Sequence, residues 1–274
     1  MRTAPLDLIV TMDDATSTIY SAFMTDEEGT ASSLRGLLET FVAKGLASSL
    51  YTDRGSHYFY TPKAGERVDK QRLTQVGRAL FRLGIEHIPA YSPEARGRSE
   101  RMFGTLQERL PKELKLAGIT DVAAANRFIA TVYLPAHNAR FAKPPEIAES
   151  AFVAADSGQL VEILCVEEER VVNRDNTVAW GGLHLQLPQS RVRHHYVRAT
   201  VKVRQYPDGA LAIFHGPRCI GRYDARGREI GEPTSSMLHP CSTPSRRGLE
   251  ASWPAPPAAR RPALTASRHG GGAL

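Results

Sequence analysis

The chain has 274 residues, which is enough for one large domain and a smaller one with a substantial hydrophobic core. Its 42% hydrophobic and 23% charged residues are ordinary for a globular protein, and the formal net charge of +6 is compatible with a polyanionic partner. Three widely separated cysteines exclude both a disulfide framework and a cysteine-rich zinc site. No segment has the pattern of a signal peptide or the length of a membrane span, so we expect a cytoplasmic protein with no membrane partner.

Short strands and amphipathic helices alternate in the first part of the chain, which predicts an α/β fold over residues 1–150. The expected elements are strands at 8–12 and 18–24, a helix at 34–42, a strand at 50–52, a helix at 73–83, a strand at 85–90, a helix from near residue 99 and a helix at 122–133. Residues 13–17 read as a hairpin turn, and residues 57–70 as a loop. We expect Pro111 to kink or break the helix that contains it.

The later part of the chain has a different texture. Short alternating segments at 169–173, 183–187, 199–204 and 211–214 are separated by turn signals. This spacing predicts a small all-β domain over residues 158–227. Residues 228–274 are rich in Pro, Ser, Ala and Arg, and we expect them to form a disordered tail.

Two acidic residues stand in settings that suit metal binding. Asp53 closes the apolar run at 49–52, and Glu100 lies in residues 91–101, where a loop turns into a helix. An Asp at a strand end and a Glu on a later helix can converge on a divalent cation, and such oxygen ligands suit Mg²⁺ or Mn²⁺. Taken singly, Asp53 could be an ordinary turn residue and Glu100 a first-turn Glu that favours the helix dipole.

The segments at residues 9–16, 51–56 and 91–101 resemble the integrase-like catalytic core of DDE transposases, and more narrowly that of bacterial insertion-sequence transposases. The resemblance covers about residues 6–145, and the β-rich stretch up to about residue 227 resembles the region that these enzymes carry behind the core. It implies a ribonuclease H-like fold in which two Asp and one Glu hold two Mg²⁺ ions for phosphoryl displacement on DNA. By this resemblance, Asp53 matches the second Asp and Glu100 matches the Glu.

The front of the core departs from the family pattern. The strand with the first Asp would fall before Met1, and Asp7, Asp13 and Asp14 do not match its position. The resemblance therefore implies an N-terminally truncated form with an incomplete triad. Three interpretations stay open: a transposase that cleaves and transfers DNA strands with a metal ion, a catalytically silent remnant that binds DNA or oligomerises, and a degraded, unstable gene product without function. The implied partners are DNA, as transposon ends and target, and further copies of the chain.

Basic side chains surround the two carboxylates. The residues predicted to contact DNA phosphates are Arg54, Arg96, Arg98 and Arg101. Lys112 and Lys115 are interpreted instead as a solvated helix face, with Glu108 and Glu113 at pairing distance along the helix. His87 and the pair His194-His195 are interpreted as ordinary strand or surface histidines.

Overall fold

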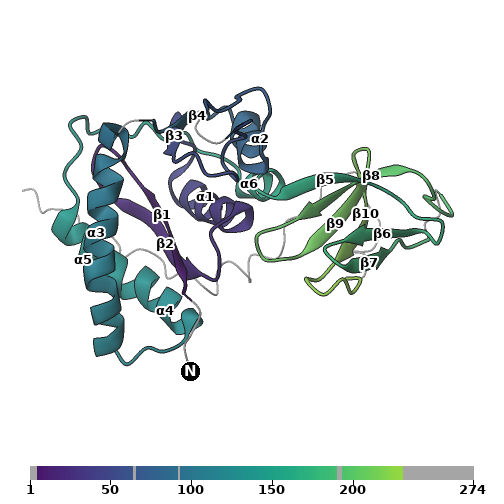
Figure 1. Cartoon of the computed structure of the whole chain (residues 1–274). Coiled ribbons are helices and arrows are strands. Elements are labelled where there is room, and N and C mark those ends of the chain that lie inside the picture. Colours follow the sequence, from purple (N-terminus) through teal and green to yellow (C-terminus); the bar gives the residue numbers. More distant parts are fainter. Residues whose placement is uncertain (1–4, 64–65, 92, 190–192, 231–274) are drawn as a thin grey trace, which may run out of the picture. The chain divides into compact units, whose positions relative to one another are not determined.

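The computed structural model describes residues 5–63, 66–91, 93–189 and 193–230, all of which lie in one compact unit, Met1–Thr243. Its first part contains β1 (Asp7–Met12), β2 (Ile19–Thr25), α1 (Thr30–Lys44), β3 (Ser49–Thr52), α2 (Gln75–Arg82), β4 (Glu86–Pro89), α3 (Pro93–Leu116), α4 (Val122–Phe128), the π-helix η1 (Ile129–Tyr133) and α5 (Leu134–Phe141) (Figure 1). After these come α6 (Ser157–Ile163), β5 (Val166–Val171), β6 (Thr177–Trp180), β7 (Leu183–Gln186), β8 (Thr200–Gln205), β9 (Leu211–His215) and β10 (Arg218–Tyr223). The predicted mixture of helices and strands is confirmed.

Strands β1 and β2 form the predicted antiparallel hairpin, in which Ile9 lies opposite Phe23. Asp13 Oδ2 closes the turn by accepting hydrogen bonds from the backbone N–H of Thr16 at 3.0 Å and from its hydroxyl at 2.5 Å. One face of the hairpin packs on α1, where a Cβ added to Gly36 would lie 3.4 Å from Ile9 Cγ2. An alanine at this position would therefore make ordinary van der Waals contact with the hairpin.

The other face of the hairpin is covered by helices α3, α4, η1 and α5. Ile19 and Ala22 of β2 are buried in the same apolar cluster as Leu106 and Leu110 of α3 and Ile129 of η1. A strand that is covered on both faces buries nearly all of its side chains, which explains why both apolar and small polar residues of β2 are buried.

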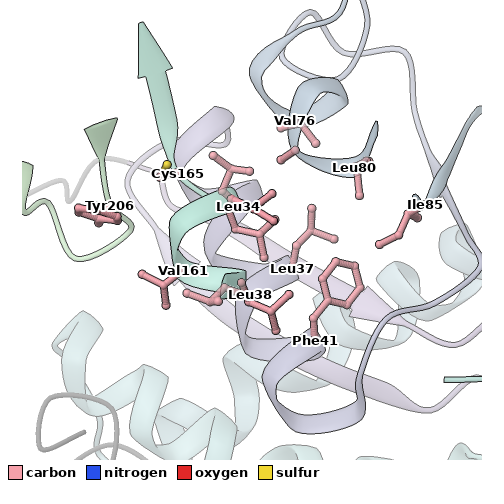
Figure 2. Close-up of a cluster of buried hydrophobic side chains, with 14 of the residues drawn as sticks. Leu34, Leu37, Leu38, Phe41, Val76, Leu80, Ile85, Val161, Cys165 and Tyr206 are labelled. Carbon is pink, nitrogen blue, oxygen red and sulfur yellow. The ribbon is translucent and has the colours of Figure 1, made fainter. Parts of the chain in front are cut away.

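Helix α1 provides the centre of a second apolar cluster. Leu34, Leu37 and Phe41 repeat at the predicted helical spacing and face Leu80 of α2 and Val161 of α6 (Figure 2). The same cluster also contains residues of the β-rich part of the chain: Cys165, Tyr206, Ala212 and Phe214. Because one apolar cluster contains residues of both parts, it does not mark a boundary between them, and the predicted domain limits, 1–150 and 158–227, stay a prediction.

Strands β3 and β4 form a parallel pair that is joined through α2. Ser49 lies opposite Glu86 and Thr52 opposite Pro89, and the Ala90 N–H donates to the Thr52 carbonyl at 2.9 Å. Gly84, with φ of +71°, allows the sharp turn from α2 into β4. Both strands therefore end at the same edge of the pair.

The predicted start of α3 near residue 99 and a break at Pro111 were wrong, whereas a kink at Pro111 stays a prediction. The helix begins at Pro93, and it continues through Pro111 to Leu116. Proline is favoured in the first turn of a helix because its missing N–H has no intrahelical partner there. At Pro111 the lost hydrogen bond is offset by packing, since Leu106, Leu110 and Leu114 anchor the helix to the hairpin on both sides of the proline.

In the β-rich part, β10, β9, β8 and β5 form a four-stranded antiparallel sheet, and β6 and β7 form a hairpin. The four predicted segments are confirmed as strands, but β6 and β10 were missed. Strand β10 carries an irregular register between Cys219 and Gly221, which obscures its alternation in the sequence. The predicted tail lies outside the described residues except for 228–230, where the Ile230 N–H donates to the Arg222 carbonyl at 2.8 Å. No helix in the described part is long and apolar enough to cross a membrane.

Candidate functional site

The candidate site lies where β3 and β4 end. Asp53 directly follows β3, and Tyr91 comes two residues after the last residue of β4. Because the strands are parallel and Thr52 lies opposite Pro89, both chain segments leave the pair at one edge. The carboxyl ends of neighbouring parallel strands are where α/β proteins commonly build ligand sites.

Asp53 is half-buried, and its side chain shapes the turn after β3. Its Oδ1 accepts a hydrogen bond from the Gly55 N–H at 2.9 Å, the pattern by which Asp stabilises a turn two residues ahead. The interpretation of Asp53 as a turn residue is therefore confirmed. This role occupies Oδ1 only, and a carboxylate can use its second oxygen for a further ligand.

A cation–π contact joins the Asp53 segment to the segment before Glu100. The Arg54 guanidinium lies 5.1 Å from the centre of the Tyr91 ring, and the Tyr91 hydroxyl accepts from the Val68 N–H at 3.1 Å. Glu100 lies exposed on α3, about two turns and roughly 10 Å along the helix from its start. The structure thus joins the Asp53 turn to Tyr91, at the start of the segment 91–101, while the pairing of Asp53 with Glu100 stays a prediction.

A complete metal site is not assembled in the described part of the chain. No group of three or more His, Cys, Asp or Glu side chains that could hold a metal ion occurs among residues 5–63, 66–91, 93–189 and 193–230. Asp7 Oδ2 accepts from the Glu28 N–H at 2.7 Å, and Asp13 is held in the hairpin turn. Asp53 and Glu100 therefore do not by themselves meet the ligand number that a divalent cation demands.

The sequence did not reveal how Thr52 and His87 support the Asp53 turn. The Thr52 hydroxyl donates to the Asp53 carbonyl at 3.0 Å and lies 2.9 Å from His87 Nε2. A hydroxyl has one proton, so Thr52 must accept from His87, which assigns the ring proton to Nε2. His87 also stacks on Phe59 with ring centres 4.0 Å apart, and burial lowers the pKa of His87 to about 4, with Lys70 adding to the effect. The interpretation of His87 as a strand histidine is confirmed.

A second set of neighbours lies on the other side of the turn. His57 Nε2 is 3.6 Å from Glu28 Oε1, and the His57 ring lies 4.0 Å from that of Tyr58. Burial raises the pKa of the Tyr58 hydroxyl, and the negative charges of Glu28 and Asp53 raise it further against a lowering hydrogen bond from Ser33. The charge of Asp53 therefore contributes to the raised pKa of Tyr58. In the sequence, the only sign of this group of side chains is that His57 follows Asp53 in the same turn.

The predicted phosphate-contacting residues have mixed outcomes. Arg54 and Arg101 are exposed, on the turn after β3 and on α3 respectively, whereas the side chains of Arg96 and Arg98 lie outside the described residues. Lys112 Nζ lies 3.5 Å from Glu108 Oε1 on the surface of α3, so its interpretation as part of a solvated helix face is confirmed.

The chain is similar to known transposases. It is 31% identical over 216 residues to the putative transposase y4bF of Sinorhizobium fredii. The matched residues make up 77% of this chain and 46% of the relative. It is 30% identical over 143 residues to the transposase for insertion sequence IS1202 of Streptococcus pneumoniae, covering 52% of this chain and 30% of the relative. The matched region thus spans less than half the length of either relative. No family model matches the chain.

Among solved structures, a chain in the cryoEM structure of the simian T-cell lymphotropic virus intasome in complex with PP2A regulatory subunit B56 gamma is 18% identical. The match covers 76% of this chain and 66% of that chain, with a TM-score of 0.35. This score is too low to assign the fold.

Proposed function

Since this chain is a relative of the insertion-sequence transposases, we propose that it acts on DNA in transposition, with Asp53 and Glu100 as metal-binding carboxylates. In this proposal β1 to α3 form a ribonuclease H-like core, and the β-rich part is an accessory region behind it. Two divalent cations held by carboxylates would activate the attacking oxygen and stabilise the leaving oxygen of a phosphodiester.

The observation that carries the proposal is the contact between Arg54 and Tyr91. It joins the turn of Asp53 to the residues that lead into the helix of Glu100, although the two carboxylates are far apart in the sequence. The Gly55 N–H orients the Asp53 carboxylate, and Thr52 holds the backbone behind it. Such supporting hydrogen bonds fix a ligand in place before an ion arrives.

The site needs at least one more ligand, which we place outside the described residues, in the same polypeptide or in another copy of the chain. DNA would be held near this edge by Arg54 and Arg101, together with Arg96 and Arg98. These side chains would contact phosphates without reading the base sequence.

A second candidate function is non-catalytic DNA binding. It is favoured by the lack of any three-donor metal group among the residues that the structure describes. In that case the chain would bind duplex DNA in a salt-sensitive manner and would compete with an active transposase, or assemble with it.

The experiment that separates the two functions is plasmid nicking with Mg²⁺ or Mn²⁺, measured beside DNA binding. The variants are Asp53→Asn, which keeps an oxygen acceptor for the Gly55 N–H, and Glu100→Gln on the exposed face of α3. The matched control is Asp208→Asn, because Asp208 Oδ1 accepts from the Ala210 N–H at 3.0 Å in the same kind of turn.

The proposal predicts that nicking is lost in Asp53→Asn and Glu100→Gln and retained in Asp208→Asn, with DNA affinity little changed in all three. DNA binding without nicking in the unmodified chain would support the second candidate. Nicking that survives in both Asp53→Asn and Glu100→Gln would overturn the ligand roles.

A further inference from the structure

A small hollow lies between α3 and the continuous helix formed by α4, η1 and α5, away from the turn that contains Asp53. Its volume is about 70 Å³, and its chemically active lining is Arg109, Glu113, Tyr133, His137, Arg140 and Phe141. Tyr133, His137 and Phe141 follow one another at intervals of four residues, so they lie along one helix face. Arg109 and Glu113 face them from α3.

Two residues that line this hollow each carry a buried polar atom without a hydrogen-bond partner among the described residues. The atoms are the Tyr133 hydroxyl and His137 Nδ1, and both residues are only 6% exposed. Buried polar groups nearly always find a partner, because leaving one unsatisfied is unfavourable. The pair therefore indicates that something polar occupies the hollow in solution.

The charge around the hollow points to an anion. Arg109 Nη2 lies 3.6 Å from Glu113 Oε1, and the guanidiniums of Arg109 and Arg140 lie 5.7 Å and 5.4 Å from the centre of the Phe141 ring. Two guanidiniums and one carboxylate leave an excess positive charge. Water could satisfy the two polar atoms, whereas an anion would satisfy them and also pair with the two guanidiniums.

His137 is suited to donate a hydrogen bond rather than to carry charge. Burial lowers its pKa, and the positive charge of Arg109 lowers it further, so the ring is neutral at pH 7. A neutral imidazole can place its proton on Nδ1 and donate from there. Together with the Tyr133 hydroxyl, this gives two donors on residues that line the hollow, which Arg109 and Arg140 also line.

The backbone at this place is also unusual. Residues Ile129–Tyr133 form a π-helical turn, in which the Leu134 N–H donates to the Ile129 carbonyl. A π-turn changes the direction in which the following side chains point, and such turns are frequently found at functional sites. It ends at Tyr133, one of the two residues with an unsatisfied atom.

We propose that this hollow binds one phosphate group of a DNA backbone through Tyr133, His137, Arg109 and Arg140. That the phosphate belongs to DNA rests on the proposed function. That the hollow binds a phosphate-like anion rests on the residues that line the hollow. The site would position the duplex and would carry no base specificity.

The test is fluorescence anisotropy of the whole chain with a labelled duplex of arbitrary sequence. Arg140→Gln removes one charge at the exposed rim and should weaken binding about tenfold, and Tyr133→Phe removes only the hydroxyl and should weaken it about threefold. The control Lys112→Gln, on the solvated face of α3, should leave the affinity unchanged. The slope of log K against log salt should fall by about one in Arg140→Gln.

Failure of this inference can be told apart from failure of the proposed function. If the unmodified chain binds the duplex and both variants bind equally well, the phosphate site is wrong and DNA binding stands. If the unmodified chain does not bind DNA, thermal unfolding in phosphate is compared with chloride at equal ionic strength. A rise in Tm that is present in the unmodified chain and Lys112→Gln but absent in Arg140→Gln would keep the oxyanion site. An equal rise in all three, or none, would overturn it.

Discussion

At the scale of single residues, His87 links the candidate site to folding stability. Burial holds the ring neutral and the positive charge of Lys70 adds to the effect, with a pKa of about 4 against 6.5 for an exposed imidazole. As pH falls from about 6.5 to about 4, the unfolded chain takes up a proton that the folded chain does not, so this contribution to stability is lost over that window.

We therefore expect the unmodified chain to be less stable to urea at pH 4.5 than at pH 7, and His87→Gln to lose less stability over the same interval. The amide of Gln can still donate to Thr52 but does not titrate. His184→Gln, at an exposed position on β7, serves as the control and should behave like the unmodified chain. An identical pH dependence in His87→Gln would refute the assignment.

Cys165 offers a second test at this scale. Burial raises the pKa of its thiol to about 11, against the lowering effect of the Arg204 and Arg78 charges. The thiolate is the reactive form, so Cys165 should resist iodoacetamide at pH 8 in the folded chain and react in urea. Peptide mass mapping checks this, and rapid labelling of Cys165 without denaturant would show that its environment is open.

At the scale of elements, two asparagines protect the free edge of β2. Asn138 accepts from the Ile19 N–H and donates to its carbonyl, both at 2.9 Å. Asn126 does the same for Met24, at 2.7 Å and 2.9 Å. The helices α4 and α5 thus replace a neighbouring strand, which satisfies the backbone and blocks edge-to-edge association.

We expect Asn138→Ala to destabilise the fold by about 2–4 kcal/mol, because two backbone groups of buried Ile19 lose their partner. Asn138→Asp keeps the acceptor for the Ile19 N–H but sets a carboxylate oxygen against the Ile19 carbonyl, so it should also destabilise the fold. Urea unfolding measures both. A change of under about 0.5 kcal/mol in Asn138→Ala, the range of a plain surface substitution, would contradict this role.

The sequence predicted those helices and strands whose pattern of apolar residues is set by neighbours close along the chain. The spacing of Leu34, Leu37, Leu38 and Phe41 predicted α1, and the apolar run before Asp53 predicted a strand that ends there. The passage of α3 through Pro111 could not be predicted, because it depends on contacts with a distant hairpin. The contact between Arg54 and Tyr91 likewise follows from the register of β3 against β4, which no local pattern encodes.

At the scale of the whole molecule, Glu167 of β5 holds several elements together. Its carboxylate lies 2.8 Å from Arg204 Nε and 2.9 Å from Lys202 Nζ on β8, and 3.7 Å from Arg82 Nη1 on α2. Its backbone exchanges two hydrogen bonds with the Gln75 side chain, at 2.8 Å and 3.0 Å. Burial would raise the pKa of Glu167, but the bonds to Lys202 and Arg204 outweigh it and lower the pKa.

Glu167→Gln should therefore destabilise the chain by about 2 kcal/mol, because a nearly buried carboxylate that pairs with Arg204 and Lys202 loses its charge, while Arg204 keeps its pair with Glu162. Glu168→Gln is the control. Its side chain is 40% exposed and paired with Arg170, so the expected change is under about 1 kcal/mol. Urea unfolding gives the free energy of unfolding of both variants. Equal values for Glu167→Gln and Glu168→Gln would show that Glu167 does not hold these elements together.

The central claim is that Asp53 and Glu100 act as one metal-binding pair. Its most direct test is a Mn²⁺ titration followed by electron paramagnetic resonance of the free ion, with duplex DNA present at a fixed concentration. The account predicts that the tightest Mn²⁺ sites are weakened at least tenfold in both Asp53→Asn and Glu100→Gln and are retained in Asp208→Asn. Equal Mn²⁺ binding by the unmodified chain and all three variants would contradict it.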